Sequence, residues 1–409
     1  MSTPETPTPE TPSPETPTSV TTTSVTVVCG PDRDPALLIA RRLRGTETTS
    51  VLLEHDLTQV DVGLVGRATE SGDGRYGAEV VELAHGCVSC TVREDMLPTL
   101  VALAAGGAVT HVVLLLPDVV EAAGFLEAFH GLALPAIGTG PSETAAATCH
   151  IDRVVAVVRA PDLIPTIDRG DTLAELGRTA ADADDRCLGE IVLRQVETAD
   201  VVVLFDASAT ERGLVRLLNP TARVLGPDDK IPTRVFDLDR TLDRADPSIV
   251  PAGADIRRDA DAWTVVWRAR RPLHPVRLHE ALDPLVDMSL RSRGTIWLAG
   301  HPDALVGWEA AGPRLSLGHV GSWLDGGDPC AWDHADPHRR VRAQLDWDAT
   351  FGDRYQEVAV TGVGDLPDVT GLLNGCLVTD AELRAGLLGA PLPSDPFADV
   401  FSHAQSQEV

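Results

Sequence analysis

Long apolar runs are absent from this chain of 409 residues. The longest, residues 112–116 and 201–205, fall far short of the roughly 20 residues that cross a bilayer, and no charged-then-apolar leader opens the sequence. We therefore predict no membrane span and no classical secretion. Basic residues are scarce as well, because 34 lysines and arginines face 61 acidic residues, for a formal net charge of -27. That balance argues against a broad nucleic-acid-binding face, since acidic side chains repel phosphate.

Cysteine is infrequent too, with seven residues, an odd number, spread over the whole chain. This usage suits a reducing compartment better than a disulfide framework, and it leaves thiols free for metal or redox chemistry. We predict a cytoplasmic protein with reduced cysteines.

The first residues form a low-complexity segment. Residues 4–18 are three five-residue repeats, PETPT, PETPS and PETPT. Their prolines block helices and central strands, and their side chains offer nothing to bury. We predict a disordered tail over residues 1–23, with a phosphorylated or protein-docking segment as the alternative.

The sequence next alternates short aliphatic runs with helical stretches, which predicts an α/β domain over residues 24–242. The expected strands are residues 24–28, 50–53, 79–83, 111–116, 154–158 and 200–205. The first is followed by Cys29, Gly30 and Pro31 and then by a helix from about Pro35, which is the order of a phosphate-binding fold. We predict a largely parallel sheet with helices on both faces, as in P-loop NTPases.

The composition changes after residue 242, because all seven tryptophans lie in the C-terminal part of the chain. We predict a linker at 243–261, a second, α+β domain at 262–390 and a tail at 391–409. Trp263, Val265 and Trp267 alternate as in a strand with one buried face. Further strands are expected at 294–300 and 357–361, helices at 275–287, 368–373 and 380–387, and core tryptophans at Trp297, Trp308 and Trp323.

The first loop lacks the groups that bind a nucleotide triphosphate. A P-loop, G-x-x-x-x-G-K-[ST], would follow Gly30 with a second glycine, a lysine and a serine or threonine at fixed offsets. The sequence has Pro35, Ala36 and Leu37 there. Proline lacks the donor N–H, alanine cannot neutralise phosphate charge, and leucine cannot hold Mg²⁺. Lys230 is the only lysine in the chain, so no other residue can supply the P-loop lysine.

Guanine recognition is missing as well. GTPases need an Asn-Lys-x-Asp run after a late strand, and residues 205–208 read FDAS at the expected place. The only asparagines, Asn219 and Asn374, stand in no such motif. We predict that GTP and Mg²⁺ do not bind as in an ordinary GTPase. Weak nucleotide binding through backbone contacts at Gly30, a vestigial P-loop, is the alternative.

A cysteine motif carries the main chemical signal of the sequence. Residues 85–91 read HGCVSCT, between an expected strand and a helix from about Arg93. Cys87 and Cys90 have the C-x-x-C spacing that places two thiolates on one tetrahedral Zn²⁺. His85 is a candidate third ligand. A thiol redox pair and a retained structural turn are the alternatives that the spacing leaves open.

Two ligands leave a zinc site incomplete, so distant residues are further candidates: Glu54, His55, Cys149 and His150. A second candidate metal segment holds Cys330, His334 and His338, where thiol and imidazole groups recur every four residues. Pro337 disfavours one helix through all three, and surface polar residues are the alternative interpretation. A basic cluster is a candidate contact for an acidic partner or rRNA, or else a solvated strand edge: Arg268, Arg270, Arg271, Arg277, Arg291 and Arg293.

Several long segments resemble the CobW-type metallochaperone GTPases of the P-loop class. Residues 80–100, VVELAHGCVSCTVREDMLPTL, are similar to that family's strand, cysteine motif and helix, and residues 213–225, GLVRLLNPTARVL, to its late Asn-Pro segment. The family's C-terminal domain is resembled by residues 291–324, by FGDRYQEVAVTGV at 351–363 and by GCLVTDAEL at 375–383. The resemblance implies a P-loop fold with a CobW C-terminal domain and a role in zinc homeostasis.

The sequence also departs from the family pattern in its cysteine motif and in its nucleotide motifs. The family's Cys-x-Cys-Cys motif has Ser89 at its middle cysteine position here, and the nucleotide motifs are lost. Residues 54–57, EHDL, and 82–98 are similar to an actinobacterial branch that recruits a hibernation-promoting factor to ribosomes when zinc is scarce. This implies a protein partner and an adaptor in which Cys87 and Cys90 report metal status. The alternative is a GTP-binding zinc metallochaperone with residual GTPase activity.

Overall fold

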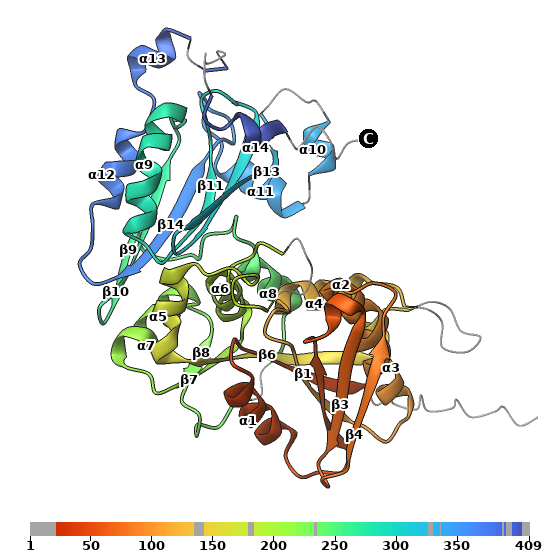
Figure 1. Cartoon of the computed structure of the whole chain (residues 1–409). Helices are drawn as coiled ribbons and strands as arrows, with labels where there is room; N and C mark the ends of the chain where they lie inside the picture. Colours follow the sequence, from red (N-terminus) through yellow and green to blue (C-terminus); the bar gives the residue numbers. More distant parts are fainter. Residues whose placement is uncertain are drawn as a thin grey trace, which may run out of the picture.

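The computed structural model describes residues 22–134, 143–178, 184–232, 235–325, 330–335, 337–386, 388–389 and 395–402. The predicted repeat tail therefore lies outside the described residues, apart from its last two. The chain folds around two sheets, one in each lobe of the molecule (Figure 1). Within the described part of the chain, no helix is long and apolar enough to cross a membrane.

The first sheet is largely parallel, which confirms the predicted α/β fold. Its strand order is β4-β3-β2-β5-β1-β6-β7-β8; β2, β5, β1, β6, β7 and β8 run parallel, and β3 and β4 are antiparallel additions at one edge. The strands are β1 Thr23–Cys29, β2 Ser50–Asp56, β3 Leu64–Ser71, β4 Tyr76–Glu82, β5 His111–Leu115, β6 Cys149–Arg159, β7 Val201–Phe205 and β8 Arg223–Leu225. Strands β3 and β8 were not predicted, because β3 is polar and β8 is very short.

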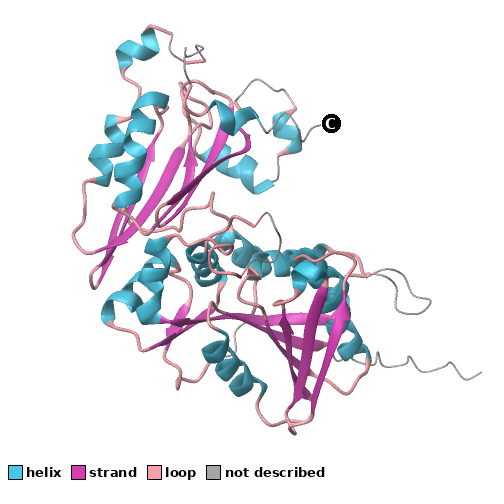
Figure 2. Ribbon diagram, viewed as in Figure 1, coloured by secondary structure: helices cyan, strands magenta, loops and turns pink. Residues whose placement is uncertain are grey.

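Helices cover both faces of this sheet (Figure 2). Along β1, Val27 and Cys29 enter the larger core, while Val28 between them enters the core beneath helix α1. This alternation explains why the second half of the strand is apolar on both of its faces, since both are buried. The helices are α1 Arg33–Arg44, α2 Val88–Thr91, α3 Leu97–Ala105, α4 Ala122–Gly131, α5 Ala160–Arg169, α6 Leu188–Thr198, α7 Ala209–Leu218 and α8 Leu238–Ala245. A π-helical turn, η2 Val92–Met96, joins α2 to α3, and short 3-10 turns lie at η1 Val60–Val62 and η3 Ala145–Ala147.

The second sheet is antiparallel, in the order β13-β12-β11-β14-β10-β9. Its strands are β9 Ile256–Asp259, β10 Ala262–Ala269, β11 Arg291–Ile296, β12 Ala304–Ala311, β13 Arg314–Ser322 and β14 Gln356–Val363. The associated helices are α9 Pro275–Asp287, α10 Ala331–His334, α11 Pro337–Leu345, α12 Val369–Gly375, α13 Asp380–Arg384 and α14 Ala398–Ser402. The tryptophans predicted for the core are indeed buried, at 1–4% exposure.

Strand β10 differs from its prediction, because both of its faces are buried rather than one. Trp263, Val265 and Trp267 enter the core beneath α9 and α12, and Val266 on the other face is 4% exposed. Helix α7 of the first lobe packs against β9, β10 and β14, and Val250 packs against Val266 on this second face. Contacts that the sequence pattern does not reveal therefore bury the strand from Ala262 to Trp267.

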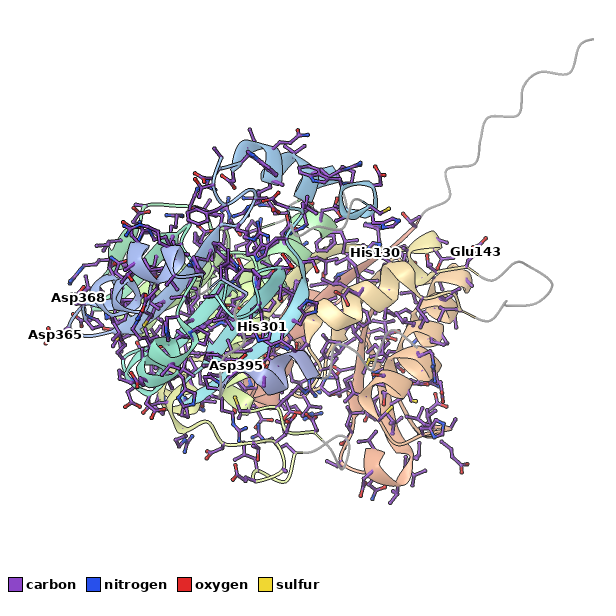
Figure 3. All side chains as sticks on the ribbon, turned by 90° about the horizontal axis from the view of Figure 1, so that it is seen from above. His130, Glu143, His301, Asp365, Asp368 and Asp395 are labelled. Atoms are coloured by element: carbon purple, nitrogen blue, oxygen red, sulfur yellow. The ribbon has the colours of Figure 1, made fainter. Side chains whose placement is uncertain are left out.

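Two segments predicted to lack structure contain elements. Strand β9 lies within residues 243–261, which were assigned to a linker. In the C-terminal segment, Phe397 is 4% exposed and packs into the core of the second lobe. Nε2 of His301 lies 2.6 Å from Oδ2 of Asp395, and the two residues are neighbours in Figure 3. Contacts with distant residues thus order part of a segment whose own composition predicts a tail.

Candidate functional site

The loop between β1 and α1 is short. Strand β1 ends at Cys29 and α1 begins at Arg33, so only residues 30–32 connect them. Asp32 is the N-cap of α1, and Asp34 lies in its first turn. A helix N-terminus attracts anions, and here two carboxylates already lie at that end. A triphosphate would meet negative charge where P-loop proteins present backbone N–H groups.

The residues at positions 36 and 37, where a P-loop has its lysine and its serine or threonine, are packed in the core. Ala36 and Leu37 are 1% and 8% exposed and belong to the core between α1 and the sheet. Gly30 lies against β6, where an added Cβ would collide with the carbonyl oxygen of Val157. A close approach of two backbones therefore explains this glycine without a nucleotide.

A pocket of about 460 Å³ nevertheless lies at the carboxyl ends of β1, β2 and β5, the edge where open α/β sheets bind ligands. Four carboxylates and two guanidinium groups line it: Asp32, Glu54, Asp56, Asp118, Arg33 and Arg178. Both guanidinium groups are paired, Arg33 with Glu54 at 2.7 Å and Arg178 with Asp118 at 3.3 Å. Burial raises the pKa of Asp118 above its usual range. The pocket carries more acidic than basic groups, so it suits a triphosphate poorly.

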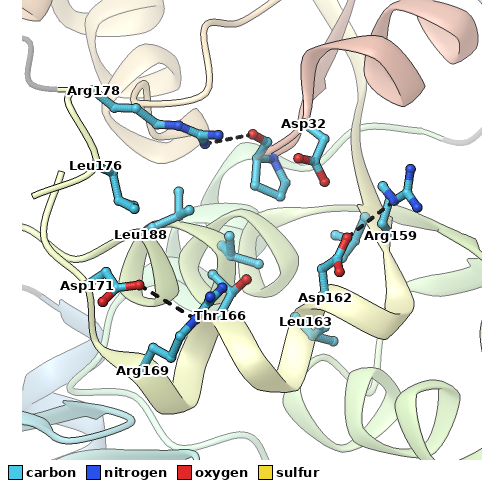
Figure 4. Close-up of a pocket in the computed structure, with 13 residues that line it drawn as sticks. Asp32, Arg159, Asp162, Leu163, Thr166, Arg169, Asp171, Leu176, Arg178 and Leu188 are labelled. Atoms are coloured by element: carbon cyan, nitrogen blue, oxygen red, sulfur yellow. Dashed lines mark hydrogen bonds and ion pairs between the residues drawn. The ribbon is translucent and has the colours of Figure 1, made fainter.

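A smaller pocket of about 200 Å³ adjoins the first and shares Pro31, Asp32 and Arg178 with it (Figure 4). Its arginines are engaged as well. Arg159 lies 3.3 Å from Asp162, Arg169 lies 3.6 Å from Asp171, and Arg178 donates to the carbonyl oxygen of Pro31. These ion pairs neutralise the cations that an added phosphate would need.

The cysteine motif begins a helix, earlier than the predicted start at Arg93. Cys87 is the N-cap of α2, and its Sγ accepts a hydrogen bond of 3.3 Å from the backbone N–H of Cys90. From Val88 the helical backbone continues through η2 and α3 to Ala105. Such a cap satisfies one of the unpaired donors at the helix start and holds the two cysteines together.

The two thiols differ in exposure and in acidity. Cys87 is half-buried and Cys90 is 5% exposed. The pKa of the Cys90 thiol is raised, first by its hydrogen bond with the adjacent Cys87 thiol and then by burial. Nη2 of Arg93 donates to Sγ of Cys90 over 3.6 Å. The preceding loop is fixed, because the Glu94 carboxylate accepts the Ala84 N–H at 3.0 Å.

The other predicted ligands do not join this pair. Throughout the described parts of the chain, no three His, Cys, Asp or Glu side chains lie close enough to hold a metal ion together. His85 is exposed. Cys149 and His150 are the first residues of β6, so they lie at the amino ends of the strands, whereas the pocket lies at the carboxyl ends. Cys149 is 1% exposed. Ligands beyond the two thiols therefore stay predictions.

His55 has a more specific environment than the sequence indicated. Its Nε2 lies 2.7 Å from Oδ2 of Asp95, and both side chains are almost fully buried. Asp95 lies on the π-helical turn after the cysteine motif and also pairs with Arg67. No described residue hydrogen-bonds the buried Nδ1 of His55, which lines the larger pocket. The pairing links the pocket to the cysteine helix, and no spacing in the sequence predicts it, because the partners lie 40 residues apart.

The second candidate metal segment is divided between two short helices. Cys330 is the N-cap of α10 and is exposed, and His334 is the last residue of α10. His338 lies in the following helix, α11. The chain bends at Ala335 between the two helices, so the three residues do not share one helical face. Their role in metal binding remains a prediction.

Two arginines of the predicted basic cluster are buried inside the protein, which corrects their assignment to a contact surface. Arg291 and Arg293 are 1% and 3% exposed, and both pair with Glu197 of α6. The remaining arginines also have partners: Arg268 pairs with Glu357 and Asp255, Arg271 with Asp380 and Arg277 with Glu382, and Arg270 lies over the Tyr355 ring. Acidic side chains from distant parts of the chain thus pair with arginines that the sequence alone suggested were free to contact a partner.

Comparisons with known proteins give the family. The description "CobW/HypB/UreG, nucleotide-binding domain" matches residues 37–225, and "Cobalamin synthesis protein cobW C-terminal domain" matches residues 262–377. A Mycobacterium tuberculosis protein named a zinc chaperone is 32% identical over 368 residues, which cover 86% of this chain and 90% of the relative. The chain belongs to the CobW family.

A second CobW relative, "Zinc-regulated GTPase metalloprotein activator 1" of Dictyostelium discoideum, is 27% identical over 334 residues, 75% of this chain and 68% of that protein. The crystal structure of the Zn(II)-bound YjiA GTPase from E. coli covers 87% of this chain and 99% of its own, with 13% identity and a TM-score of 0.34. The CobW nucleotide-binding match begins at residue 37, after the loop that follows β1.

Proposed function

We propose that this CobW-family chain handles zinc without hydrolysing GTP. The observation that carries the proposal is the first loop, where α1 begins at Arg33 and leaves no phosphate cradle. Asp32, Asp34 and Asp118 supply negative charge where a nucleotide would need donors and cations. Catalysis of phosphoryl transfer depends on such positioned cations, so their loss removes the activity while the fold remains.

The cysteine pair fits zinc as a transient cargo. Cys87 and Cys90 supply two of the four ligands that tetrahedral Zn²⁺ takes, and within the described residues no further ligand group joins them. A structural zinc site is closed by four protein ligands, whereas a site with open positions allows exchange. The zinc-related names of the Mycobacterium and Dictyostelium relatives support zinc as the metal.

We further propose that the chain is an adaptor that brings a hibernation-promoting factor to ribosomes in zinc-poor cells. Support comes from the resemblance of residues 54–57 and 82–98 and from an exposed apolar area on the second lobe. There, Val341, Leu345 and Trp347 are 55%, 81% and 47% exposed, a typical property of protein contact surfaces. The net charge of -27 favours a protein contact over direct binding to rRNA.

Calorimetry on the full-length reduced protein tests the ligand assignments. Zn²⁺ should bind to the wild type and fail to bind when Cys87 and Cys90 are both replaced by serine. Cys376→Ser, which changes a buried thiol in the core of the second lobe, is the matched control and should bind zinc like the wild type. GTP with Mg²⁺ should give no binding heat. Tight GTP binding with slow turnover would instead establish the alternative, a metallochaperone with residual GTPase activity.

A ribosome pull-down tests the adaptor role. The wild type should bring hibernation factor to ribosomes after chelation of zinc and lose this effect when zinc is restored. Leu345→Asp places a charge in the exposed apolar area and should weaken recruitment, while Leu388→Asp, at another exposed leucine, should not. Equal recruitment with and without zinc would remove the proposed zinc dependence.

A further inference from the structure

The cysteine motif of this chain joins two cysteines by a hydrogen bond at the start of helix α2, with no third cysteine between them. The middle position is Ser89, and it is exposed. The backbone N–H of Cys90 donates to Sγ of Cys87 at 3.3 Å, which holds the two cysteines side by side. The C-x-x-C spacing at the start of a helix is the arrangement in which protein thiols form and break disulfides. This cap places the two cysteines next to each other on one turn of the helix.

Access to solvent is unequal within the pair. Cys87 is half-buried and open to a small oxidant, whereas Cys90 is 5% exposed. Outside the pair, four cysteines are 0–3% exposed and lie in the two cores: Cys29, Cys149, Cys187 and Cys376. Cys330 is exposed, but it lies on the second lobe. The motif is therefore the place where an accessible thiol has a second thiol as its immediate neighbour.

We propose that Cys87 and Cys90 form a reversible disulfide when hydrogen peroxide reaches them, and that this disulfide releases or excludes zinc. Sγ of Cys87 attacks one peroxide oxygen, the O–O bond breaks, and the first water leaves as Cys87 becomes a sulfenic acid. Sγ of Cys90 then attacks Sγ of Cys87, the S–O bond breaks, and the hydroxyl leaves with the thiol proton as a second water. Two thiols lose two electrons, and the peroxide is reduced to two waters.

The geometry assigns the order of these steps. Cys87 is the exposed partner and reacts first, and the buried Cys90 resolves the sulfenic acid from inside the protein. A neighbouring resolving thiol protects the first sulfur from irreversible oxidation. The effect on metal rests on the proposed function, because a disulfide sulfur no longer offers the thiolate that zinc requires.

Intact-mass analysis and peptide mapping test the proposal on the full-length Cys330→Ser protein, which avoids crosslinks between exposed thiols. After treatment with substoichiometric hydrogen peroxide, the protein should lose two hydrogens per molecule, and a peptide crosslinking Cys87 to Cys90 should appear and vanish on reduction. Cys90→Ser should stop at a sulfenic acid on Cys87 that dimedone traps. Cys87→Ser should give neither product. Prior loading with Zn²⁺ should slow the reaction.

The outcomes separate this proposal from the zinc assignment. If the crosslink forms and the oxidised protein no longer binds zinc, both the proposed disulfide and its effect on zinc binding are supported. If the crosslink forms in a protein that never bound zinc, the disulfide stands, and the zinc part and the proposed function fail. Peroxide that leaves Cys87 and Cys90 as free thiols, or oxidises Cys87 irreversibly without a crosslink, overturns the disulfide, whatever the zinc titration shows.

Discussion

An ion pair between the two lobes should make a large, pH-dependent contribution to stability. The Glu309 carboxylate on β12 accepts hydrogen bonds from Arg194 of α6 at 2.7 Å and from Arg291 of β11 at 2.9 Å. The side chains of Glu309 and Arg291 are 11% and 2% exposed. Burial by itself raises the pKa of Glu309, but the two arginines outweigh it and lower the pKa from 4.5 to about 2.

The size and sign of the effect follow from the difference in pKa between the folded and unfolded states. A carboxyl pKa lowered by this amount corresponds to about 3 kcal/mol of stability at neutral pH. Because the folded-state pKa of Glu309 is the lower one, this stability is present above the ordinary pKa of 4.5 and is lost as the pH falls towards 2. About half of it should be gone at roughly pH 3.

Urea denaturation of Glu309→Gln, followed by tryptophan fluorescence and by circular dichroism, measures this contribution. We expect a loss of about 3 kcal/mol at pH 7 and roughly half that loss at pH 3. Asp259→Asn is the matched control, because Asp259 also pairs across the lobes, with Arg216 at 3.3 Å, but at the surface. That change should cost less than about 1 kcal/mol. Equal costs for both variants, or a Glu309→Gln cost that does not fall with pH, would refute the reasoning.

Two further predictions concern the first lobe. Gly30→Ala should lower the free energy of unfolding by about 1–3 kcal/mol, because the added Cβ meets the Val157 carbonyl. Gly124→Ala in α4 is the control, because its Cβ would enter open space, and it should raise that free energy by about 0.5–1 kcal/mol. Similar changes for both variants would contradict the close approach of Gly30 to β6. Asn219→Asp should lower the free energy of unfolding by about 3 kcal/mol, because Nδ2 donates towards three buried carbonyl oxygens, of Val196, Glu197 and Ala199, that a carboxylate would repel. Asn374→Asp keeps its acceptor for Trp267 Nε1 and should change stability far less; a comparable loss there would sink the explanation.

Five of the parallel strands and the helix that follows β1 could be predicted because their signal is local. Aliphatic runs buried on both faces gave strands β1, β2, β5, β6 and β7, and the helix predicted at residues 275–287 has the bounds of α9. Elements whose burial depends on other segments were missed. Polar β3 joins the sheet by pairing with β2, and β9 is held by β10.

The sequence by itself determined which chemical groups the site has. The single lysine, the residues at positions 35–37 and the serine between two cysteines are properties of composition and spacing, and the fold cannot supply a missing group. The sequence thereby shows that the chain has no G-x-x-x-x-G-K-[ST] run and that it has a C-x-x-C pair.

Only the tertiary structure decided how these groups are paired. Asp95 lies against His55, Glu309 lies between Arg194 and Arg291, and most of the basic cluster is neutralised by acidic side chains from other elements. The physical reason is that ion pairs and burial depend on distance in space, and the partners here are separated by tens of residues in the chain. Charge and hydrophobicity can be read from a sequence, whereas desolvation and pairing exist only after the chain has folded.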